Sequence, residues 1–530
     1  MMESNNGKRS FNCVDSPWIP VPNYGLVSLR AIFENESLPA LGGTPIQKIA
    51  LLKLLQAVAQ SACTPKDEEE WNRLDIAVFK QKCLSYLDKW HDAFDLYGSQ
   101  PFLQMPAVAN AEIASFADLD PQKASGNTTF LTELQIDFAL SDSDKALLLL
   151  TQMAFATASK KGGLGFTLSK NYSEKHNSKG NPRPHRSGPG LGDRGYLHSF
   201  VEGKNILSTL YLNLATHQSI EHMKCFPEGL GTAPWEKMPE SENCAVAQKL
   251  QKSFMGRLLP LNRFCLLSEK GMHYCEGILY DSFENGGFEP TQSITRKGTK
   301  FQTLWADPEK KPWRCLSSLL SFLGTSNTGR WNCPQLEWGL KRCSRLDEPA
   351  TIWSGGQRFS NKIVQFMSGA DDAVQSTFVL MSKDIKPDWF DLFSLEMNEI
   401  EHLSNILFQS VKEYFIDISD NNKSDTKRAS GKYKGKDHGT DSVDEHFKKS
   451  NERANSFAKK ATADFWRNAE AYAQELISAC SEYKTSNVRR KFANLLRRTY
   501  SAACPIAKPR QVLAWVRHQP NCGRYLKEKQ

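Results

Sequence analysis

The stretch VRRKFANLLRRTY, residues 488–500, decides the architecture of the C-terminal part of the chain. Val488, Phe492, Leu495 and Thr499 recur every three or four positions, which is the spacing of one face of an α-helix. A helix with such a stripe must bury it against neighbouring elements. The stripe therefore predicts a helix that packs inward, with the basic residues between its apolar positions facing outward together.

Three further helices with the same periodicity surround this stretch in the sequence. Their stripe residues are Ile400, Leu403, Leu407, Val411 and Tyr414, then Ala461, Phe465, Tyr472, Leu476 and Tyr483, and finally Val512, Trp515 and Val516 after Pro509. Short links between helices favour antiparallel neighbours. Residues 381–530 are therefore expected to form an antiparallel four-helix bundle, interrupted by a polar insertion at about 419–445 that has the composition of a disordered segment.

Residues 1–380 show a different texture. Thr44-Pro45 is a helix start, with a capping hydroxyl and proline at the first helical position. Hairpins are predicted over 274–288 and 293–305, with Asn285-Gly286 and Lys297-Gly298 as turns. At 530 residues the chain also exceeds the roughly 250–300 residues that one core can serve. The expected fold is α+β: a large mixed α/β domain with antiparallel strands, followed by the bundle.

The net charge of +8 conceals an uneven distribution. Residues 421–530 carry 24 basic and 11 acidic residues, and residues 159–195 carry 8 and 2. The rest of the chain carries 35 basic and 46 acidic residues, a net charge of −11. Clustered lysine and arginine bind nucleic acid by displacing counterions from its phosphates, but solvated helix faces have the same composition.

The expected location is the cytoplasm. Residues 1–10 lack an apolar core, so no secretory signal is expected, and the apolar stretch from Ala146 to Ala158 is shorter than the roughly 20 residues of a membrane span. Thirteen irregularly spaced cysteines favour reduced thiols over a disulfide framework.

Enzyme motifs are not found in the sequence. No phosphate-binding G-x-x-x-x-G-K-[ST], H-E-x-x-H or C-x-x-C occurs, so no catalytic residue, metal site or cofactor is predicted. One alternative is a metal-dependent nuclease that uses His176, His185 and His198. The acidic run from Asp67 to Glu70 is expected to be the solvated first turn of a helix.

Two basic regions offer binding chemistry instead. Residues 159–195 combine many glycines, whose backbone N–H groups are free of side-chain bulk, with lysines such as Lys160 and Lys161. The helix around 488–500 and the residues after it carry a second group of cations, which would suit a nucleic-acid strand. These are Arg489, Arg490, Lys491, Arg497, Arg498, Lys508 and Arg510.

Several segments together resemble the CasA family, the large subunit of the type I-E CRISPR Cascade surveillance complex. The segments are D-S-P-W-I-P-V at 15–21, F-x-L…P-F-L-Q at 94–104, S-F-V-E-G…S-T-L-Y-L-N-L at 199–214, S-G-G-Q-R at 354–358, and the helical C-terminus. Their order covers nearly the whole chain. The resemblance implies a non-catalytic subunit that recognises the protospacer-adjacent motif in double-stranded DNA, promotes duplex opening and R-loop formation, and holds the displaced strand. It also implies two kinds of protein partner, the crRNA-containing Cascade subunits and the CRISPR helicase-nuclease. A third reading is a non-specific RNA-binding scaffold.

The resemblance also assigns DNA-contacting positions. The family's first DNA-contacting loop corresponds to Asn127, Thr128, Thr129, Phe130, Leu131, Thr132 and Glu133. Its glycine-rich loop corresponds either to Gly162, Gly163 and Gly165 or to the stretch 188–195, and its lysine finger to Lys270. The wedge that separates the first base pairs corresponds to Ser360, Asn361 and Lys362, where relatives often carry glutamine in place of Asn361. The displaced strand would lie along the basic helix, from Arg489 to Arg510.

Overall fold

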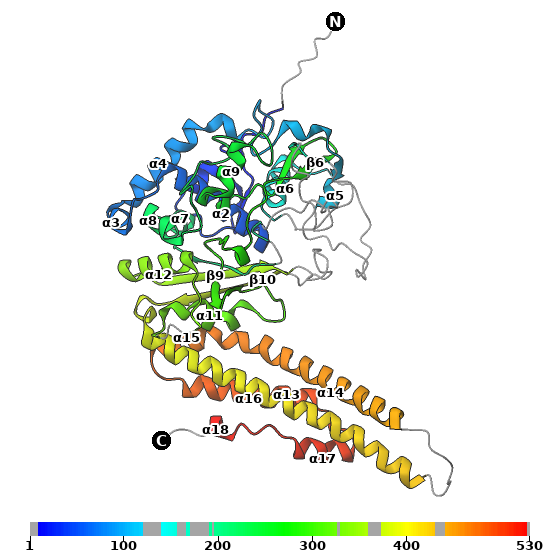
Figure 1. Cartoon of the computed structure of the whole chain (residues 1–530). Helices are drawn as coiled ribbons and strands as arrows, with labels where there is room; N and C mark the ends of the chain where they lie inside the picture. The colour runs from blue at the N-terminus through cyan, green and yellow to red at the C-terminus, as the bar shows by residue number, and fades with distance from the viewer. Residues whose placement is uncertain are drawn as a thin grey trace. The chain divides into compact units, whose positions relative to one another are not determined.

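The computed structural model describes residues 9–119, 139–155, 166–169, 190–192, 195–325, 329–358, 373–429 and 440–526. The chain divides into two compact units, which are described separately (Figure 1). Unit 1 comprises residues 1–322 and 326–382, and unit 2 comprises residues 323–325 and 383–530.

Among the described residues of unit 1, all paired strands are antiparallel and form four small sheets. The strands are β1 (Ile19–Val21) with β2 (Gly25–Val27); β10 (Ala373–Leu380), β9 (Ala350–Gln357) and β4 (His198–Glu202); β3 (Ile113–Ser115), β6 (Gly271–Glu276) and β5 (Arg263–Leu267); and β7 (Ile294–Lys297) with β8 (Lys300–Thr303). The expected mixture of helices and antiparallel strands is therefore confirmed.

The helices of unit 1 surround these sheets. They are α1 (Leu29–Glu34), α2 (Pro45–Ala62), α3 (Glu68–Arg73), α4 (Ile76–Lys89), α5 (Phe116–Leu119), α6 (Asp142–Ala154), α7 (Ile206–Leu212), α8 (His217–Met223), α9 (Ala245–Gln251), α10 (Phe254–Leu258), α11 (Leu316–Leu319) and α12 (Pro334–Leu346). Helix α12 lies along the β10-β9-β4 sheet (Figure 1). The cross-strand pair Phe200 and Trp353, with ring centroids 5.0 Å apart, fixes the register of β4 on β9.

Helix α2 forms the centre of unit 1. It begins as the sequence predicts, because the Thr44 hydroxyl accepts from the Gln47 N–H and the Gln47 side chain accepts from the Thr44 N–H. Its apolar face is buried, and so are Lys48 and Lys53. A helix buried on all sides needs internal partners for its charges.

Ion pairs neutralise buried cations inside unit 1, and Lys48 contacts Glu202 at 2.6 Å. Lys53 is fully buried and contacts the Glu289 carboxylate. Arg342 is also fully buried, and its guanidinium contacts Glu68 at 2.6 Å while it lies 4.4 Å from the Trp71 ring. Glu68 opens α3 as predicted, but it is not simply a solvated first-turn acid. The local sequence around Glu68 does not show that its carboxylate pairs with Arg342, which is 274 positions away.

One predicted hairpin is confirmed and one is wrong. The turn at Lys297-Gly298 joins β7 to β8, and Gly298 has a φ of +62°. In contrast, residues 274–288 do not form a hairpin. Strand β6 pairs with the preceding strand β5, and Asn285-Gly286 instead closes a short 3-10 helix, Phe283–Asn285. The glycine signal marked a left-handed residue correctly but did not specify which element it terminates.

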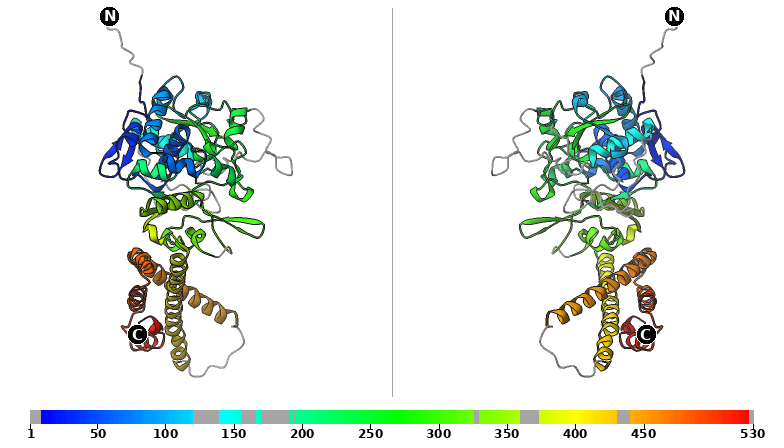
Figure 2. Two further views of the ribbon diagram at one scale, coloured as in Figure 1. Left: turned by 90° about the vertical axis from the view of Figure 1, so that its left-hand side faces the viewer. Right: turned by 90° about the vertical axis from the view of Figure 1, so that its right-hand side faces the viewer.

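The regular elements among the described residues of unit 2 are all helices. Its elements are α13 (Pro387–Ala429), α14 (Thr440–Ala469), α15 (Ala473–Ser481), α16 (Ser486–Ala503), α17 (Pro509–Arg517) and α18 (Gly523–Leu526). Helix α13 contacts α14, α15, α16 and α17. Figure 2 shows α13 (yellow) and α14 (orange) crossing at an angle, and the two helices pack closely against each other. The Trp466 indole N–H of α14 donates to the Ser404 hydroxyl of α13 at 2.9 Å.

Several details of the predicted stripes differ in the structure. Tyr483 is 61% exposed, because it lies in the turn between α15 and α16 with a φ of +56°. Val512 and Val516 are exposed as well, and α17 buries Ala514 instead. The polar insertion is helical at both ends, since α13 extends to Ala429 and α14 begins at Thr440. Residues 430–439 lie outside the described residues.

Candidate nucleic-acid interface

Two predicted DNA-contacting segments follow residues that lie at the C-terminal end of α6. Gln152, in the last turn of α6, donates its side-chain amide N–H to the Leu119 carbonyl and accepts from Arg263 at 2.8 Å. Leu119 ends α5, and the predicted loop at 127–133 follows it in the sequence. Phe155 caps α6, and the basic region 159–195 follows Phe155. Residues 127–133, Lys160, Lys161 and Gly162–Gly165 lie outside the described residues.

The far end of the basic region returns to this same helix end. The Leu191 N–H donates to the Ala154 carbonyl at 2.8 Å. Gly190 packs so closely here that a Cβ would collide with the Ala154 carbonyl oxygen and the Asn262 side-chain oxygen. Glycine is therefore required at 190 for close packing, not for a positive φ.

His198 makes a second contact with Leu191, at the end of the basic region. It is 1% exposed at the start of β4, and its Nε2–H donates to the Leu191 carbonyl at 2.6 Å. Its Nδ1 lies 2.8 Å from the Thr291 hydroxyl and 3.3 Å from the Glu289 carboxylate. Burial by itself would raise the pKa of Glu289, but Lys53 and His198 oppose burial and lower that pKa to about 2.

This burial argues against the nuclease alternative. His198 has both ring nitrogens engaged inside unit 1, so it cannot present itself to a metal ion and DNA in the way the alternative required. His176 and His185 lie outside the described residues. In the part of the chain that the structure describes, no group of three or more His, Cys, Asp or Glu side chains could hold a metal ion.

The predicted wedge belongs to the connection between β9 and β10. Ser360, Asn361 and Lys362 lie outside the described residues, but Gln357 and Ala373, which flank this connection, pair with each other. The 354–357 stretch is the last part of strand β9. A Cβ at Gly356 would collide with the Tyr196 carbonyl, so this glycine also serves close strand packing.

Strand β4 brings the basic region and the wedge connection to one end of the same sheet. His198, the first residue of β4, pairs with Gly355 near the end of β9. The Ala306 N–H donates to the Gly195 carbonyl at 2.8 Å, and Tyr196 stacks on Trp305 with centroids 5.4 Å apart. Two segments that are about 160 residues apart in the sequence therefore leave the sheet at neighbouring positions.

Lys270 is an exposed residue in the turn between β5 and β6. The next residue, Gly271, pairs with Ser115, and α5 follows Ser115 directly. Lys270 is therefore next to the strand that leads towards the loop at 127–133. Whether it contacts DNA stays a prediction.

The sequence predicted that the cations of α16 all face outward. The structure shows that they do not. Arg489 forms two hydrogen bonds with the buried Glu396 carboxylate, at 2.5 and 2.6 Å. Lys491 contacts both oxygens of Glu475 at 2.7 Å. Arg490 is exposed and bonds Asn487 at 3.1 Å. The exposed basic residues of this part of the chain also include Arg497, Arg498, Lys508 and Arg510.

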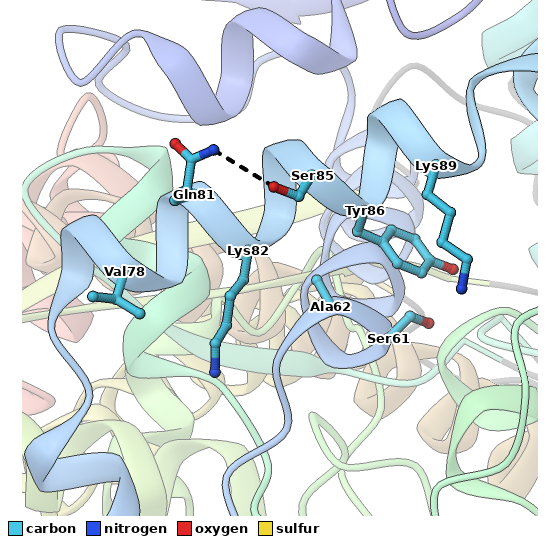
Figure 3. A pocket seen from close by; sticks show the side chains of 8 residues that line it. All are labelled: Ser61, Ala62, Val78, Gln81, Lys82, Ser85, Tyr86 and Lys89. Atoms are coloured by element: carbon cyan, nitrogen blue, oxygen red, sulfur yellow. Dashed lines mark hydrogen bonds between the residues drawn. The ribbon is translucent and has the colours of Figure 1, made fainter.

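Two hollows among the described residues of unit 1 are lined by residues other than those predicted to contact DNA. The first, about 470 Å³, lies between α4 and the end of α2. Figure 3 shows Lys82, Tyr86 and Lys89 of α4 along its wall. The second, about 420 Å³, lies between α8, the β7–β8 hairpin and the start of α12, with Phe288, Phe301 and Trp338 in its lining.

The remaining predictions concern thiols and membranes. All thirteen cysteines lie within the described residues, and each is a free thiol. Burial raises the pKa of Cys265 and Cys333 to about 12, so these thiols are protonated core residues. Within the described residues, no helix has both the length and the apolar composition to cross a membrane.

Comparison with known proteins decides the family. A family model for CRISPR-associated protein Cse1 matches residues 12–503. The chain belongs to the Cse1 family. The family match confirms the resemblance to the CasA family. In addition, a curated CasA/Cse1 protein of Thermus thermophilus is 31% identical to this Cse1-family chain over 160 residues. That match spans 28% of the chain and about a third, 32%, of the relative.

Solved structures share the fold over almost the full length. A crystal structure of Cse1 from Acidimicrobium ferrooxidans has a TM-score of 0.68 at 18% identity and covers 98% of both chains. A chain of a CRISPR RNA-guided surveillance complex has a TM-score of 0.64 at 13% identity, covering 96% of this Cse1-family chain and 99% of that chain. At such identities these matches show the common mixed α+β fold.

Sequence reasoning missed the residues that hold Leu168, Ser169 and the ends of α5 and α6 in unit 1. Glu242 is 4% exposed and accepts from the N–H groups of Leu168 and Ser169, each at 2.7 Å. Gln152 and Arg263 were missed as well. These residues have no periodicity or motif, since they act on backbone groups far away in the sequence, so no signal in a single sequence could have found them.

Proposed function

We propose that this Cse1-family chain is the non-catalytic large subunit of a type I-E CRISPR Cascade complex. In this role it recognises a protospacer-adjacent motif in double-stranded DNA, promotes duplex opening and R-loop formation, holds the displaced strand, and recruits the helicase-nuclease. Its partners would be the crRNA-containing subunits, the target DNA and that nuclease. Family membership over residues 12–503, together with a fold shared with a chain of an RNA-guided surveillance complex, supports the assembly role.

The observation that carries the DNA-recognition role is the meeting of segments at the end of α6. Leu119, Phe155 and Leu191 lie together there, and they lead in the sequence to the loop at 127–133 and to both ends of the basic region. Backbone N–H groups and small polar side chains suit readout of the degenerate minor-groove edge. Phe130, Lys270 and the wedge residues 360–362 are the proposed motif-reading and duplex-opening groups.

Unit 2 is proposed to hold the displaced strand. We assign it to the family's four-helix bundle on the contacts of α13 with α14, α16 and α17. Arg497, Arg498, Lys508 and Arg510 are exposed along α16 and the start of α17, where a phosphate backbone could lie against them. Arg489 and Lys491 contribute less, because Glu396 and Glu475 already neutralise them.

The first test is assembly and motif dependence. The tagged full chain is expected to co-purify with partner subunits and a small guide RNA. The complex should bind a guide-matched duplex at least about tenfold more tightly when the correct flanking base pairs are present, since each mismatched pair costs about 1–3 kcal/mol. Phe130→Ala should abolish this ratio without loss of co-purification. Tyr24→Ala is the matched control, an aromatic that is 47% exposed in the β1–β2 turn.

Other outcomes would favour the rival functions. Binding to RNA or DNA with no dependence on flanking sequence would indicate a general scaffold. Cleavage of DNA by the purified chain with Mg²⁺ or Mn²⁺, lost in His176→Ala, would indicate a nuclease and would contradict the proposal.

A further inference from the structure

Two phenylalanines form an aromatic stack between α13 and α14 in unit 2. The rings of Phe415 on α13 and Phe457 on α14 are nearly parallel, with an interplanar angle of 15° and centroids 4.2 Å apart. Phe457 is 47% exposed, although it is a large apolar side chain. Because Phe415 covers one face of the Phe457 ring, the exposed surface lies mainly on the opposite face. The stack therefore ends in a flat aromatic surface that faces solvent.

Phe415 is held in place by the core of unit 2. Its ring meets the Tyr414 ring at 90°, with centroids 5.0 Å apart. Tyr414 is fully buried, and its hydroxyl donates to the Pro505 carbonyl. The buried residues of α14 in this stretch are the alanines at positions 454, 458 and 461. Phe457 therefore lies beside the buried side of its helix, at the edge of the helix packing.

Basic side chains surround the stack. Arg453 and Lys460 are exposed, and they lie four positions before and three positions after Phe457, which places them on the same face of α14. Lys412 is half-buried and lies three positions before Phe415 on α13. Within the part of the chain that the structure describes, none of these three cations has an ion pair or a side-chain hydrogen bond.

The acidic side chains of this part of unit 2 are engaged elsewhere or lie on another face. On α14, Asp464 forms an ion pair within the same helix, at 2.7 Å. On α13, Glu413 and Asp417 contact side chains at the end of α17, at 3.3 and 2.7 Å. Glu452 is exposed, but it is five positions before Phe457 and so lies on another side of α14. The surface around the exposed ring is therefore positively charged.

We propose that Phe457 stacks on a base of the displaced DNA strand, while Arg453, Lys460 and Lys412 hold the neighbouring phosphates. Proteins that hold single strands combine cations along the backbone with aromatic faces for the bases. Arg453 and Lys460 lie about 10 Å apart along the helix axis, on either side of the ring, so the phosphates on both sides of a stacked base meet a cation. The inference rests on the proposed function, and it adds a base contact on α14 to the phosphate contacts proposed for α16.

The test compares two single strands that differ only in their bases. The full chain is titrated with a thymidine strand of about twelve nucleotides and with an abasic strand that has the same number of phosphates. Phe457→Ala should weaken binding of the thymidine strand by about tenfold, the usual loss for one stacked base. It should change binding of the abasic strand by less than about twofold, because the same cations still meet the phosphates.

The cations should behave differently from the ring. Arg453→Ala combined with Lys460→Ala should weaken binding of both strands alike. It should also lower the slope of log affinity against log salt by about 1.4, since each contact with a single strand contributes about 0.7. Leu395→Ala is the matched apolar control. Leu395 is 61% exposed on α13 but has Asp391 and Glu399 four positions away on either side, so its loss should leave both affinities within about twofold.

Two further variants separate base stacking from helix packing. Phe457→Leu keeps an apolar side chain against Phe415 but has no flat ring, so it should weaken binding of the thymidine strand as alanine does. Phe457→Trp should keep the preference for the thymidine strand over the abasic strand. If leucine preserves that preference, or if Phe457→Ala weakens binding of both strands equally, the ring serves packing alone and the proposal is wrong. Hydrogen exchange of α13 and α14 identifies any variant that folds poorly, and the tryptophan variant still gives a result there.

The assembled complex shows whether the displaced strand reaches the stack. The fluorescent base 2-aminopurine is quenched when it stacks, and it can be placed at successive positions of the displaced strand of a guide-matched duplex. At one position its fluorescence should rise in Phe457→Ala and stay low in Phe457→Trp. If no position responds, the displaced strand does not stack there and the proposal is overturned.

The remaining outcomes distinguish this inference from the function on which it rests. If Phe457→Ala leaves both affinities unchanged while Arg498→Ala lowers the salt slope, the stacking role is wrong and the displaced-strand role of unit 2 stands. If the unaltered chain binds neither strand, both are wrong. If Phe457→Ala reduces co-purification of partner subunits without changing the preference for bases, the ring contacts a protein and not DNA.

Discussion

The two basic regions of the chain are held in opposite ways. In α16, two acids contact the cations themselves: Arg489 packs against the buried carboxylate of Glu396, and Lys491 forms a half-exposed ion pair with Glu475. In the region 159–195, the described anchors use main-chain groups, and no basic side chain takes part in the bonds to Glu242 or His198. A count of charges treats both regions alike. The comparison shows that cations bound to buried acids should be subtracted before a basic surface is taken as a nucleic-acid site.

The largest expected effect tests the structural use of charge in α16. Arg489→Ala leaves the buried Glu396 carboxylate without its partner and should destabilise unit 2 by about 3 kcal/mol. Arg490→Ala, one position away on the exposed face, should cost less than about 0.5 kcal/mol. Hydrogen exchange of α13 and α16 during denaturant unfolding would measure both. Equal costs would mean that Arg489 is an ordinary surface cation.

A smaller effect tests the anchor at the end of the basic region. The pKa of Glu289 is about 2 in the folded chain, below its ordinary 4.5, so its ion pairs stabilise unit 1 fully above pH 4.5. That contribution is lost as the pH falls from 4.5 towards about 2. The loss should be on the order of 2 kcal/mol between about pH 6 and about pH 3, because protonation of Glu289 in the folded chain is still incomplete at the lower pH.

Stability of unit 1 measured at about pH 6 and about pH 3 checks this effect. Glu289→Gln provides the control, since it should be less stable at the higher pH and should lose this part of the acid dependence. An unchanged dependence in the variant would show that other carboxylates account for it.

The smallest effect tests which cations of α16 meet a strand. Arg498→Ala should lower the slope of log affinity against log salt by about 0.7, the value for one contact with single-stranded nucleic acid. Lys491→Ala should change the slope less, because Glu475 already holds the ammonium group. Binding of single-stranded DNA at several salt concentrations gives both slopes. A larger change for Lys491 than for Arg498 would reverse the assignment made from the structure.

Much of the fold could be predicted from local signals. The start of α2 at Pro45, the β7–β8 turn and the buried stripe from Ile400 to Tyr414 all depend on residues within a few positions of one another. The incorrect hairpin over 274–288 and the exposed Tyr483 have the opposite origin. Their outcome depends on which distant strand or helix is available to pair with them, and the local pattern is compatible with either result.

The candidate site was predictable only in part. The glycine and lysine composition of 159–195 and the resemblance of 127–133 and 360–362 to family positions indicated which segments to consider. Neither indicated that Gln152 joins α5 to α6, or that His198 is an internal anchor and not an exposed metal ligand. A histidine followed by alternating apolar residues has the same local pattern in both roles.

By itself, the sequence determined the family, the mixed α+β class, the separate helical C-terminal part and the presence of two basic regions. The fold class, the helical part and the basic regions follow from composition and from spacing along the chain, which are local quantities, whereas the family rests on the resemblance of the quoted segments. Only the tertiary structure decided which charges are available. Lys53, Arg342 and Arg489 look like solvated cations in the sequence, yet each contacts an acid that folding places beside it. The physical reason is that burial makes an unpaired charge so costly that its partner must be supplied from wherever the fold brings one close.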